Sequence, residues 1–248
     1  MRPLSRLAPL AVATALLASC HTNDVTSTAV KESRAVTFPS SDGVQLSGRL
    51  FGPDSARTGI VLAHMLPADE SSWYEFAIFL SQRGYKALTF DFRGYCPGGD
   101  AGCSQGSKQV SAIWQDVAGA VTFLRAQGVS HVALVGASMG GTASLVVASM
   151  PAEQIAAVLT LSAPQSIEGL AAGPDVIQRV TVPKLFIAGN VDPSGAADAV
   201  NAFCSESTQP VRCEIFPSAD HGTDLLSGNQ SENVRTLILT WLQQFVPS

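Results

Sequence analysis

The sequence has few charged residues and no cluster of basic ones. Lysine, arginine, aspartate and glutamate make up 14% of the 248 residues, and 20 acidic residues against 15 basic ones give a net charge of −5. Proteins that bind nucleic acid neutralise its phosphates with clustered lysine and arginine. The composition therefore predicts no nucleic-acid partner, and it provides no electrostatic attraction to anionic membranes.

The sequence patterns that bind common cofactors are also missing. The chain has neither a phosphate-binding loop nor a dinucleotide fingerprint. Its five cysteines show no C-x2-C spacing and have no nearby pair of histidines, both of which are usual in zinc sites. We therefore expect no metal and no other cofactor.

No apolar run is long enough to cross a bilayer as a mature helix. The longest, residues 7–17, follows Arg2 and Arg6 and leads into Leu-Ala-Ser-Cys20. A basic start, a short apolar stretch and small residues before a cleavage point are typical of an export signal. We assign residues 1–19 to a signal peptide.

The four residues Leu-Ala-Ser-Cys20 resemble the lipobox of bacterial lipoproteins. The resemblance implies cleavage before Cys20 and acylation of its thiol and its new amino group, so that a lipid anchor holds the exported protein in the cell envelope. Several acyl chains anchor firmly, whereas one alone binds weakly. Simple secretion is the alternative. Residues 20–35 are polar, which predicts a tether to a domain over residues 36–248.

The other four cysteines are an even number, which in an exported chain indicates disulfides. Three connectivities are possible. We favour local pairs: Cys96 with Cys103 across a glycine-rich loop, and Cys204 with Cys213 between a helix end and the next strand.

Strand and helix patterns alternate through the domain. Residues 36–38 and 44–51 alternate in polarity around a Ser-Asp-Gly turn, which predicts an antiparallel hairpin. Largely apolar runs predict six buried strands, at residues 59–63, 86–90, 132–135, 157–161, 184–188 and 211–216. Helical periodicity predicts helices at about residues 73–80, 110–124, 142–149, 196–204 and 232–245. This order predicts one α/β domain with a doubly wound, mostly parallel sheet of eight strands.

A serine stands where the strand over residues 132–135 meets the next helix, in Gly136-Ala137-Ser138-Met139-Gly140. The G-x-S-x-G pattern can arise by chance in a glycine-rich turn with an idle serine, but a strand before it and a helix after it are the context that it needs. The Oγ atom of Ser138 would then be exposed at the carboxyl edge of the sheet. The N–H of Met139, at the helix start, would be free to bind an oxyanion.

With this turn after the fifth strand, residues 36–246 resemble an α/β-hydrolase. In that family the acid follows the seventh strand and the histidine follows the last one, positions that Asp192 and His221 occupy. The resemblance implies that Ser138 is the nucleophile, that His221 is the general base, and that Asp192 orients the imidazole.

Other histidines and carboxylates fit these roles less well. His21 lies in the tether, His131 starts a strand at the opposite edge, and His64 closes the third strand. Asp220 and Asp224 are nearer to His221 in sequence than Asp192 is, but a residue adjacent to the histidine usually points elsewhere.

His64-Met65 stands where relatives often have His-Gly. An oxyanion hole needs only the backbone N–H of residue 65, so we expect the N–H groups of Met65 and Met139 to form it. We expect His64 to position this loop, and the side chains of Met65, Leu66 and Trp73 to crowd the acyl side of the site.

These residues predict a serine hydrolase acting on a small acyl substrate. The family resemblance favours carboxylic esters, while thioesterase, lactonase or peptidase chemistry would use the same residues. The segment over residues 164–183 is too short for a large cap, which favours short acyl chains. A non-catalytic envelope lipoprotein that uses the fold as a binding scaffold is the alternative. We expect a monomer by default.

Overall fold

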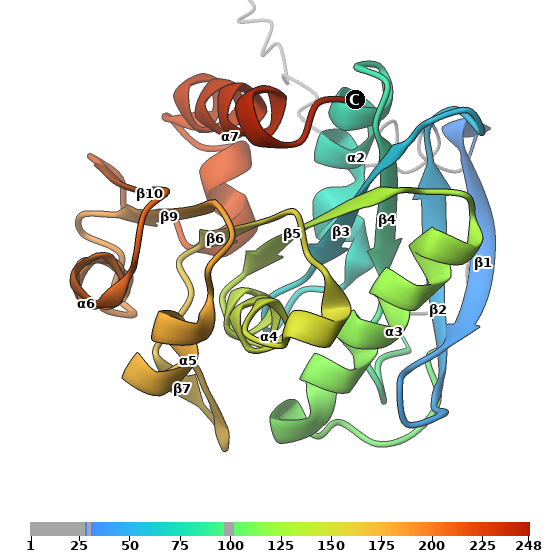
Figure 1. Cartoon of the computed structure of the whole chain (residues 1–248), viewed down its shortest axis with the longest axis horizontal. Coiled ribbons are helices and arrows are strands. Elements are labelled where there is room, and N and C mark those ends of the chain that lie inside the picture. The colour runs from blue at the N-terminus through green and yellow to red at the C-terminus, as the bar shows by residue number, and fades with distance from the viewer. Residues whose placement is uncertain (1–27, 29–30, 97–101) are drawn as a thin grey trace, which may run out of the picture.

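Eight strands form one sheet, in the order β1-β2-β4-β3-β5-β6-β9-β10 (Figure 1). The computed structural model describes residues 28, 31–96 and 102–248. The strands of this sheet are β1 (Ser33–Pro39), β2 (Gln45–Phe51), β3 (Thr58–Ala63), β4 (Lys86–Phe90), β5 (His131–Ala137), β6 (Ala157–Leu161), β9 (Lys184–Gly189) and β10 (Val211–Phe216). In this sheet β3, β4, β5, β6, β9 and β10 pair in parallel, whereas β1 and β2 join it antiparallel. The predicted α/β fold with a mostly parallel eight-stranded sheet is confirmed.

The first strand begins earlier than predicted. β1 starts at Ser33 and pairs residue for residue with β2, from Ser33 opposite Phe51 to Pro39 opposite Gln45. The side chains of Arg34 and Ala35 are both exposed, which an edge strand tolerates. The pairing therefore extends into the segment that we predicted to be a tether.

Helices cover both faces of the sheet, and Figure 1 shows α2 and α7 above it and the other α-helices below it. The upper face carries η1 (Glu70–Trp73), α2 (Tyr74–Ser81), η4 (Gly222–Leu226) and α7 (Ser231–Phe245). The lower layer contains η2 (Val110–Ala112), α3 (Ile113–Ala126), α4 (Met139–Ala148), η3 (Pro151–Glu153), α5 (Pro174–Arg179) and α6 (Ala196–Glu206). This is the doubly wound arrangement that the alternation predicts.

The apolar core has two parts, one on each face of the sheet. Phe76, Leu80 and Ile238 are buried between the sheet and the helices α2 and α7. Val121 of α3 and Leu145 of α4 belong to the part on the opposite face, between the sheet and these two helices. Because both faces are covered, β3 to β6 consist almost entirely of buried residues, and this explains their continuous apolar sequences.

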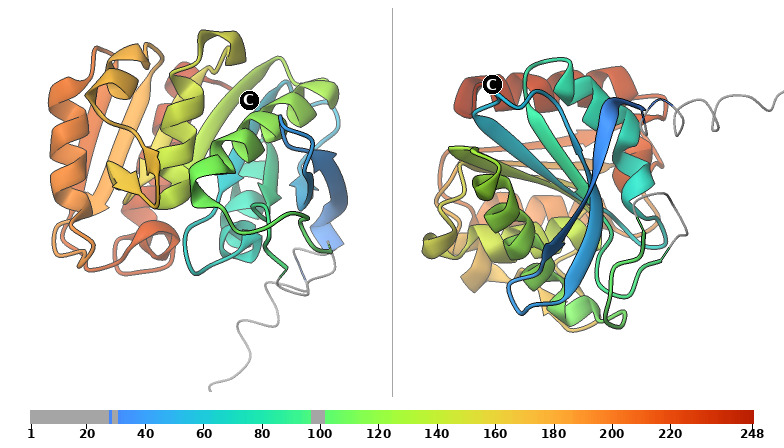
Figure 2. Two further views of the ribbon diagram at one scale, coloured as in Figure 1. Left: turned by 90° about the horizontal axis from the view of Figure 1, so that it is seen from below. Right: turned by 90° about the vertical axis from the view of Figure 1, so that its right-hand side faces the viewer.

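A short insertion separates β6 from β9. Its first part is a two-stranded hairpin of β7 (Ser166–Ile167) and β8 (Leu170–Ala171), which periodicity did not predict because each strand has only two residues. The six-residue helix α5 (Pro174–Arg179) follows. Figure 2 shows this insertion beside α4, and among the described residues it adds no separate cap domain to the main layers.

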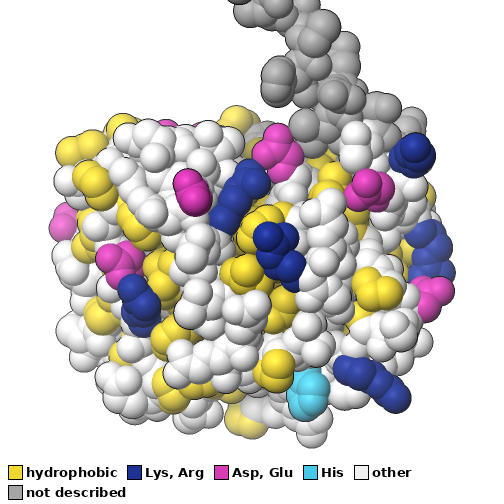
Figure 3. Space-filling model, turned by 90° about the horizontal axis from the view of Figure 1, so that it is seen from above, with side chains coloured by type: hydrophobic (Ala, Val, Ile, Leu, Met, Phe, Trp, Pro, Cys, Tyr) yellow, Lys and Arg dark blue, Asp and Glu magenta, His cyan; other side chains and the backbone are white. Residues whose placement is uncertain are grey.

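The surface over α2 and α7 carries basic and acidic side chains interspersed with apolar ones (Figure 3). In the part of the chain that the structure describes, no helix is both long and apolar enough to span a membrane.

Candidate active site

The chain makes a sharp turn at Ser138, between β5 and α4. Ser138 has φ 48° and ψ −120°, a strained backbone conformation that non-glycine residues seldom adopt. A Cβ atom at Gly136 would collide with the backbone of Gly140, and one at Gly140 would collide with the carbonyl group of Ala63. The two glycines therefore allow strand, turn and helix to pack this closely, as the sequence predicts.

The turn places Ser138 at the carboxyl edge of the sheet, where its N–H donates to the Leu161 carbonyl of β6 at 2.8 Å. Its side chain is mostly buried, with 6% of the residue exposed. The helix begins at Met139, directly after the serine, rather than at residue 142 as predicted. The first N–H groups of a helix have no acceptor within it, so the N–H of Met139 is available to an oxyanion beside Ser138.

Asp192 and His221 meet at the same edge of the sheet. Asp192 follows β9 and His221 follows β10, and His221 Nδ1 lies 2.8 Å from Asp192 Oδ2. The residue after the histidine, Gly222, lies against Ala137, because a Cβ atom on Gly222 would be 3.3 Å from the Ala137 Cβ. The loop that holds His221 therefore packs against the turn that holds Ser138.

A residue that we did not predict, Ser194, also contacts this pair. Its N–H donates to Asp192 Oδ1 at 2.9 Å, and its Oγ lies 3.2 Å from His221 Nδ1. Burial opposes ionisation of Asp192, but the hydrogen bonds from Ser194 and His221 outweigh it and hold the pKa of Asp192 below its usual value. The sequence signal for Ser194 is weak: a serine two residues after an aspartate in a turn.

The two alternative acids, Asp220 and Asp224, have no hydrogen bond of this kind to His221 among the described contacts. Asp220 accepts a hydrogen bond from the hydroxyl of Ser218 at 2.7 Å. Asp224 lies in η4, where burial raises the pKa of its carboxyl. Of the three carboxylates considered, Asp192 is the one whose hydrogen bond to His221 the structure shows.

The loop after β3 is held in place by His64. The imidazole is fully buried: its Nε2 accepts the N–H of Phe92 at 3.1 Å, and its Nδ1 donates to the Met65 carbonyl at 2.9 Å. Burial lowers the pKa of His64 to about 4, so the ring is neutral near pH 7. These contacts support the expected role of His64 in positioning the loop. They fix the carbonyl group of Met65, the residue whose N–H is the predicted oxyanion donor.

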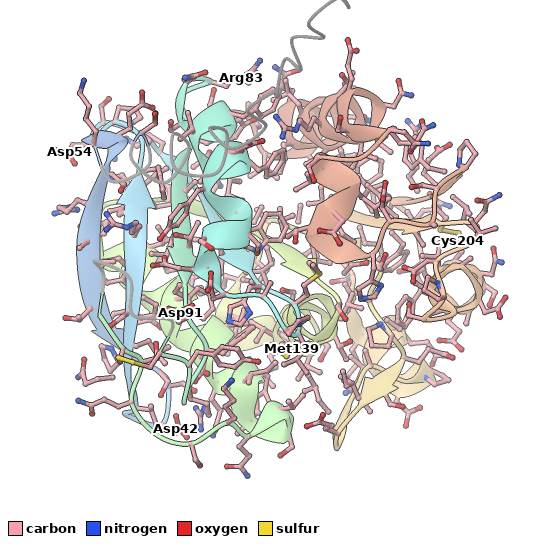
Figure 4. All side chains as sticks on the ribbon, turned by 180° about the vertical axis from the view of Figure 1, so that it is seen from behind. Asp42, Asp54, Arg83, Asp91, Met139 and Cys204 are labelled. Carbon is pink, nitrogen blue, oxygen red and sulfur yellow. A yellow bond between two sulfur atoms is a disulfide. The ribbon has the colours of Figure 1, made fainter. Side chains whose placement is uncertain are left out.

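Two buried carboxyl groups, those of Asp91 and Glu70, lie at the end of the same loop. Asp91, directly after β4, accepts the N–H of Glu70 at 2.9 Å. The carboxyl of Glu70 accepts hydrogen bonds from Thr89 at 2.7 Å and Tyr74 at 3.1 Å. Burial raises the pKa of Glu70 to about 8 and that of Asp91 to about 6. Figure 4 shows Asp91 and Met139 near the middle of the molecule.

The predicted walls of the acyl pocket are partly wrong. Trp73 is fully buried in the core beneath α2, so it cannot line an open site. The thioether of Met65 is turned toward the loop after His221, where it accepts a hydrogen bond from Thr223 at 3.7 Å. Sequence periodicity does not indicate either orientation. Leu66 is half-buried against the lower part of the core.

The Asp91-Phe-Arg-Gly94 turn after β4 is held in place by Arg93. The guanidinium of Arg93 bonds to Asp116 on α3 at 2.7 Å and to Asp42, in the turn between β1 and β2, at 2.7 Å. It therefore joins three segments at the end of β4.

Both local disulfides are present, Cys96–Cys103 and Cys204–Cys213. Figure 4 marks Cys204 at the edge of the molecule, far from Met139. Within residues 28, 31–96 and 102–248, no group of histidine, cysteine and carboxylate side chains is arranged to bind a metal. The predicted lipid-bearing Cys20 lies outside the described residues.

Comparisons with known proteins agree on the fold. Residues 59–181 match the family described as the α/β hydrolase fold. No curated protein sequence matches the chain significantly.

Several solved structures are similar over most of the chain. An esterase from Pyrococcus furiosus is 16% identical with a TM-score of 0.73, covering 93% of this chain and 96% of its own. A dienelactone hydrolase from Anabaena variabilis is 20% identical with a TM-score of 0.68, and the esterase domain of a Rhodothermus marinus protein is 22% identical with a TM-score of 0.67. Each of these two matches covers 86% of this chain and 99% of the other.

Proposed function

Because the chain has the α/β-hydrolase fold, we propose that it is a serine hydrolase that cleaves carboxylic esters through an acyl-enzyme intermediate. The observation that carries this proposal is the 2.8 Å hydrogen bond between Asp192 and His221, with the loop of His221 packed against the strained turn at Ser138. The similar structures include esterases and a dienelactone hydrolase, and these names support an ester as the substrate.

The proposed first step is attack of Ser138 on the acyl carbonyl. When Nδ1 of His221 donates its proton to Asp192, Nε2 is unprotonated and takes the proton of the Ser138 hydroxyl. The carboxylate of Asp192 stabilises the imidazolium that forms. The histidine then gives the proton to the leaving alcohol, and water releases the acyl group by the reverse sequence of transfers.

The negative charge that develops on the carbonyl oxygen of the substrate requires hydrogen-bond donors at the same edge of the sheet. The N–H groups of Met65 and Met139 are proposed to supply them, because backbone donors that are already oriented stabilise an oxyanion without reorganisation. His64 supports this arrangement by holding the Met65 carbonyl at 2.9 Å.

A fluorophosphonate probe tests the proposal directly. The folded protein should be labelled, Ser138→Ala should not be, and Ser149→Ala at the end of α4 should be labelled like the natural protein. Ser149 is a suitable control because its hydroxyl bonds to the Val146 carbonyl, one helix length from the turn. Absence of labelling in correctly folded protein would favour the non-catalytic scaffold.

The proposed location is the cell envelope, with a lipid anchor at Cys20. The Leu-Ala-Ser-Cys sequence at the end of an export signal supports it. Growth of cells with an alkyne fatty acid should label the protein, and Cys20→Ser should abolish the label. Unlabelled protein in the culture medium would support simple secretion instead.

A further inference from the structure

The side chain of Met65 connects two loops that carry different parts of the proposed machinery. Its backbone follows β3 and belongs to the proposed oxyanion hole. Its thioether lies against Gly222 and accepts the hydroxyl hydrogen bond of Thr223 at 3.7 Å, although Met65 and Thr223 are 158 residues apart. Only 7% of Met65 is exposed.

Gly222 matches this side chain in size. It has φ +56°, and a Cβ atom there would collide with the Met65 sulfur and come within 3.3 Å of the Ala137 Cβ. Gly222 directly follows His221, and Ala137 directly precedes Ser138. The loop that carries the histidine is therefore seated between the serine turn and the methionine, with no space for another methyl group.

The methionine is itself held firmly at its backbone. His64 donates to the Met65 carbonyl at 2.9 Å and accepts the Phe92 N–H at 3.1 Å. A continuous series of contacts consequently runs from the end of β4 through His64 and Met65 to Gly222. These hydrogen bonds fix the backbone of Met65, and the hydroxyl of Thr223 and the contact with Gly222 hold its thioether against the histidine loop.

We propose that Met65 is a positioning residue for His221: its thioether, packed against Gly222 and hydrogen-bonded to Thr223, sets the distance between the histidine loop and the serine turn. This inference rests on the proposed hydrolase function. Truncation of Met65 would let the histidine loop approach or tilt, and displacements of about 1 Å in catalytic groups can cost about a hundredfold in rate.

A double-mutant cycle between residues 65 and 222 tests the inference. With a p-nitrophenyl ester as substrate, Met65→Ala should lower kcat about tenfold or more with little change in KM, and Gly222→Ala should lower kcat as well. In the double variant the methyl group added at position 222 no longer meets the thioether, so only the strain from the φ of +56° and the 3.3 Å approach to the Ala137 Cβ remains. The kcat of the double variant should therefore exceed the product of the two single effects by about tenfold.

Two further variants separate packing from hydrogen bonding and guard against misfolding. Met65→Leu keeps the volume, so it should retain most of kcat, and Thr223→Val should cost little beyond the loss of one weak bond. Met150→Ala, at a half-buried methionine after α4, is the control for loss of a methionine and should leave kcat unchanged.

Independent single effects that multiply in the double variant would overturn the inference, as would a Met65→Leu that loses as much kcat as Met65→Ala. Both results require that the natural protein hydrolyses the ester and is labelled by fluorophosphonate. If it does neither, the proposed function fails, and this outcome is distinct from an active enzyme with no coupling between the two positions.

Discussion

His221 and Asp192 are joined by a hydrogen bond of 2.8 Å, with the carboxylate side chain fully buried and the histidine side chain 26% exposed. The order of the strands in the sheet brings these two residues together. β9 and β10 are parallel neighbours whose last residues, Gly189 and Phe216, lie opposite each other, so the two following loops start at the same level. The Asn190 N–H donates to the Phe216 carbonyl at 2.8 Å and ties the loops together at their origin.

This geometry predicts that Asp192→Asn lowers kcat by up to about 10⁴-fold. An amide in place of the carboxylate favours the wrong tautomer of His221 and does not stabilise the imidazolium. Measurement of kcat on a p-nitrophenyl ester checks the prediction, with Asp220→Asn as the matched control because Asp220 bonds to Ser218. Near-full activity of Asp192→Asn together with a large loss in Asp220→Asn would reassign the acid.

The proposed site contains residues that could be predicted from the sequence and residues, such as Ser194, that could not. The residues proposed as the triad are predicted from a G-x-S-x-G turn between strand and helix, and from an aspartate and a histidine after the last two parallel strands, where the resemblance to α/β-hydrolases implies them. The contacts of Ser194 and the orientation of Met65 depend on how separate loops pack, which no periodicity encodes. The same reason explains why Trp73, at helical spacing, proved to be core rather than pocket wall.

The bounds of the strands also include some that the sequence predicts and some that it does not. β4 and β6 begin and end where their apolar runs predict, because burial on both faces requires apolar side chains along the strand. β1 begins three residues early, since an edge strand is held by backbone pairing to β2 that leaves little trace in side-chain polarity.

Glu70→Gln should stabilise the protein above about pH 5. Burial raises the pKa of Glu70 from 4.5 to about 8, so between these values the unfolded chain releases a proton that the folded protein retains. Stability is unaffected by this group at low pH and falls as pH rises through this window, by at most about 1.4 kcal/mol per pH unit. Glutamine mimics the neutral acid facing Thr89 and Tyr74 and removes that loss.

Chemical denaturation of both proteins from pH 4 to pH 9 measures this effect. The gain should grow with pH up to about 8 and then level off. Glu75→Gln is the control, because Glu75 is exposed on α2 and pairs with Arg235 at 2.9 Å at the surface, where a pair contributes at most about 1 kcal/mol. A constant difference between Glu70→Gln and the natural protein at every pH would show that Glu70 does not titrate as expected.

Removal of the Cys204–Cys213 disulfide should destabilise the fold without altering the site. The bridge closes a short loop between the end of α6 and β10, for which the entropy of the unfolded chain gives about 2–3 kcal/mol. Cys204→Ser/Cys213→Ser should lower Tm by several degrees, measured by calorimetry, while kcat at 25 °C stays the same. An unchanged Tm, or free thiols found at these positions in the natural protein, would contradict the expectation.

Substrates with short acyl chains should be preferred. The insertion between β6 and β9 contains only a small hairpin and the short helix α5, so little protein is available to cover a long acyl chain beyond Ser138. A buried methylene contributes about 0.8 kcal/mol only where apolar wall receives it. The gain in kcat/KM should therefore end after a few carbons, with a maximum between acetyl and butyryl esters.

A series of p-nitrophenyl esters with acyl chains of two to sixteen carbons, assayed with and without an oil–water interface, measures this limit. Each added methylene that is fully buried in the site should raise kcat/KM about fourfold. Methylenes beyond the apolar wall of the site should leave kcat/KM unchanged. Because the insertion between β6 and β9 is too small to open as a large cap, the rate should show no jump at the interface. A maximum beyond ten carbons, or a sharp rise at the interface, would mean that a further segment of the chain encloses the acyl group.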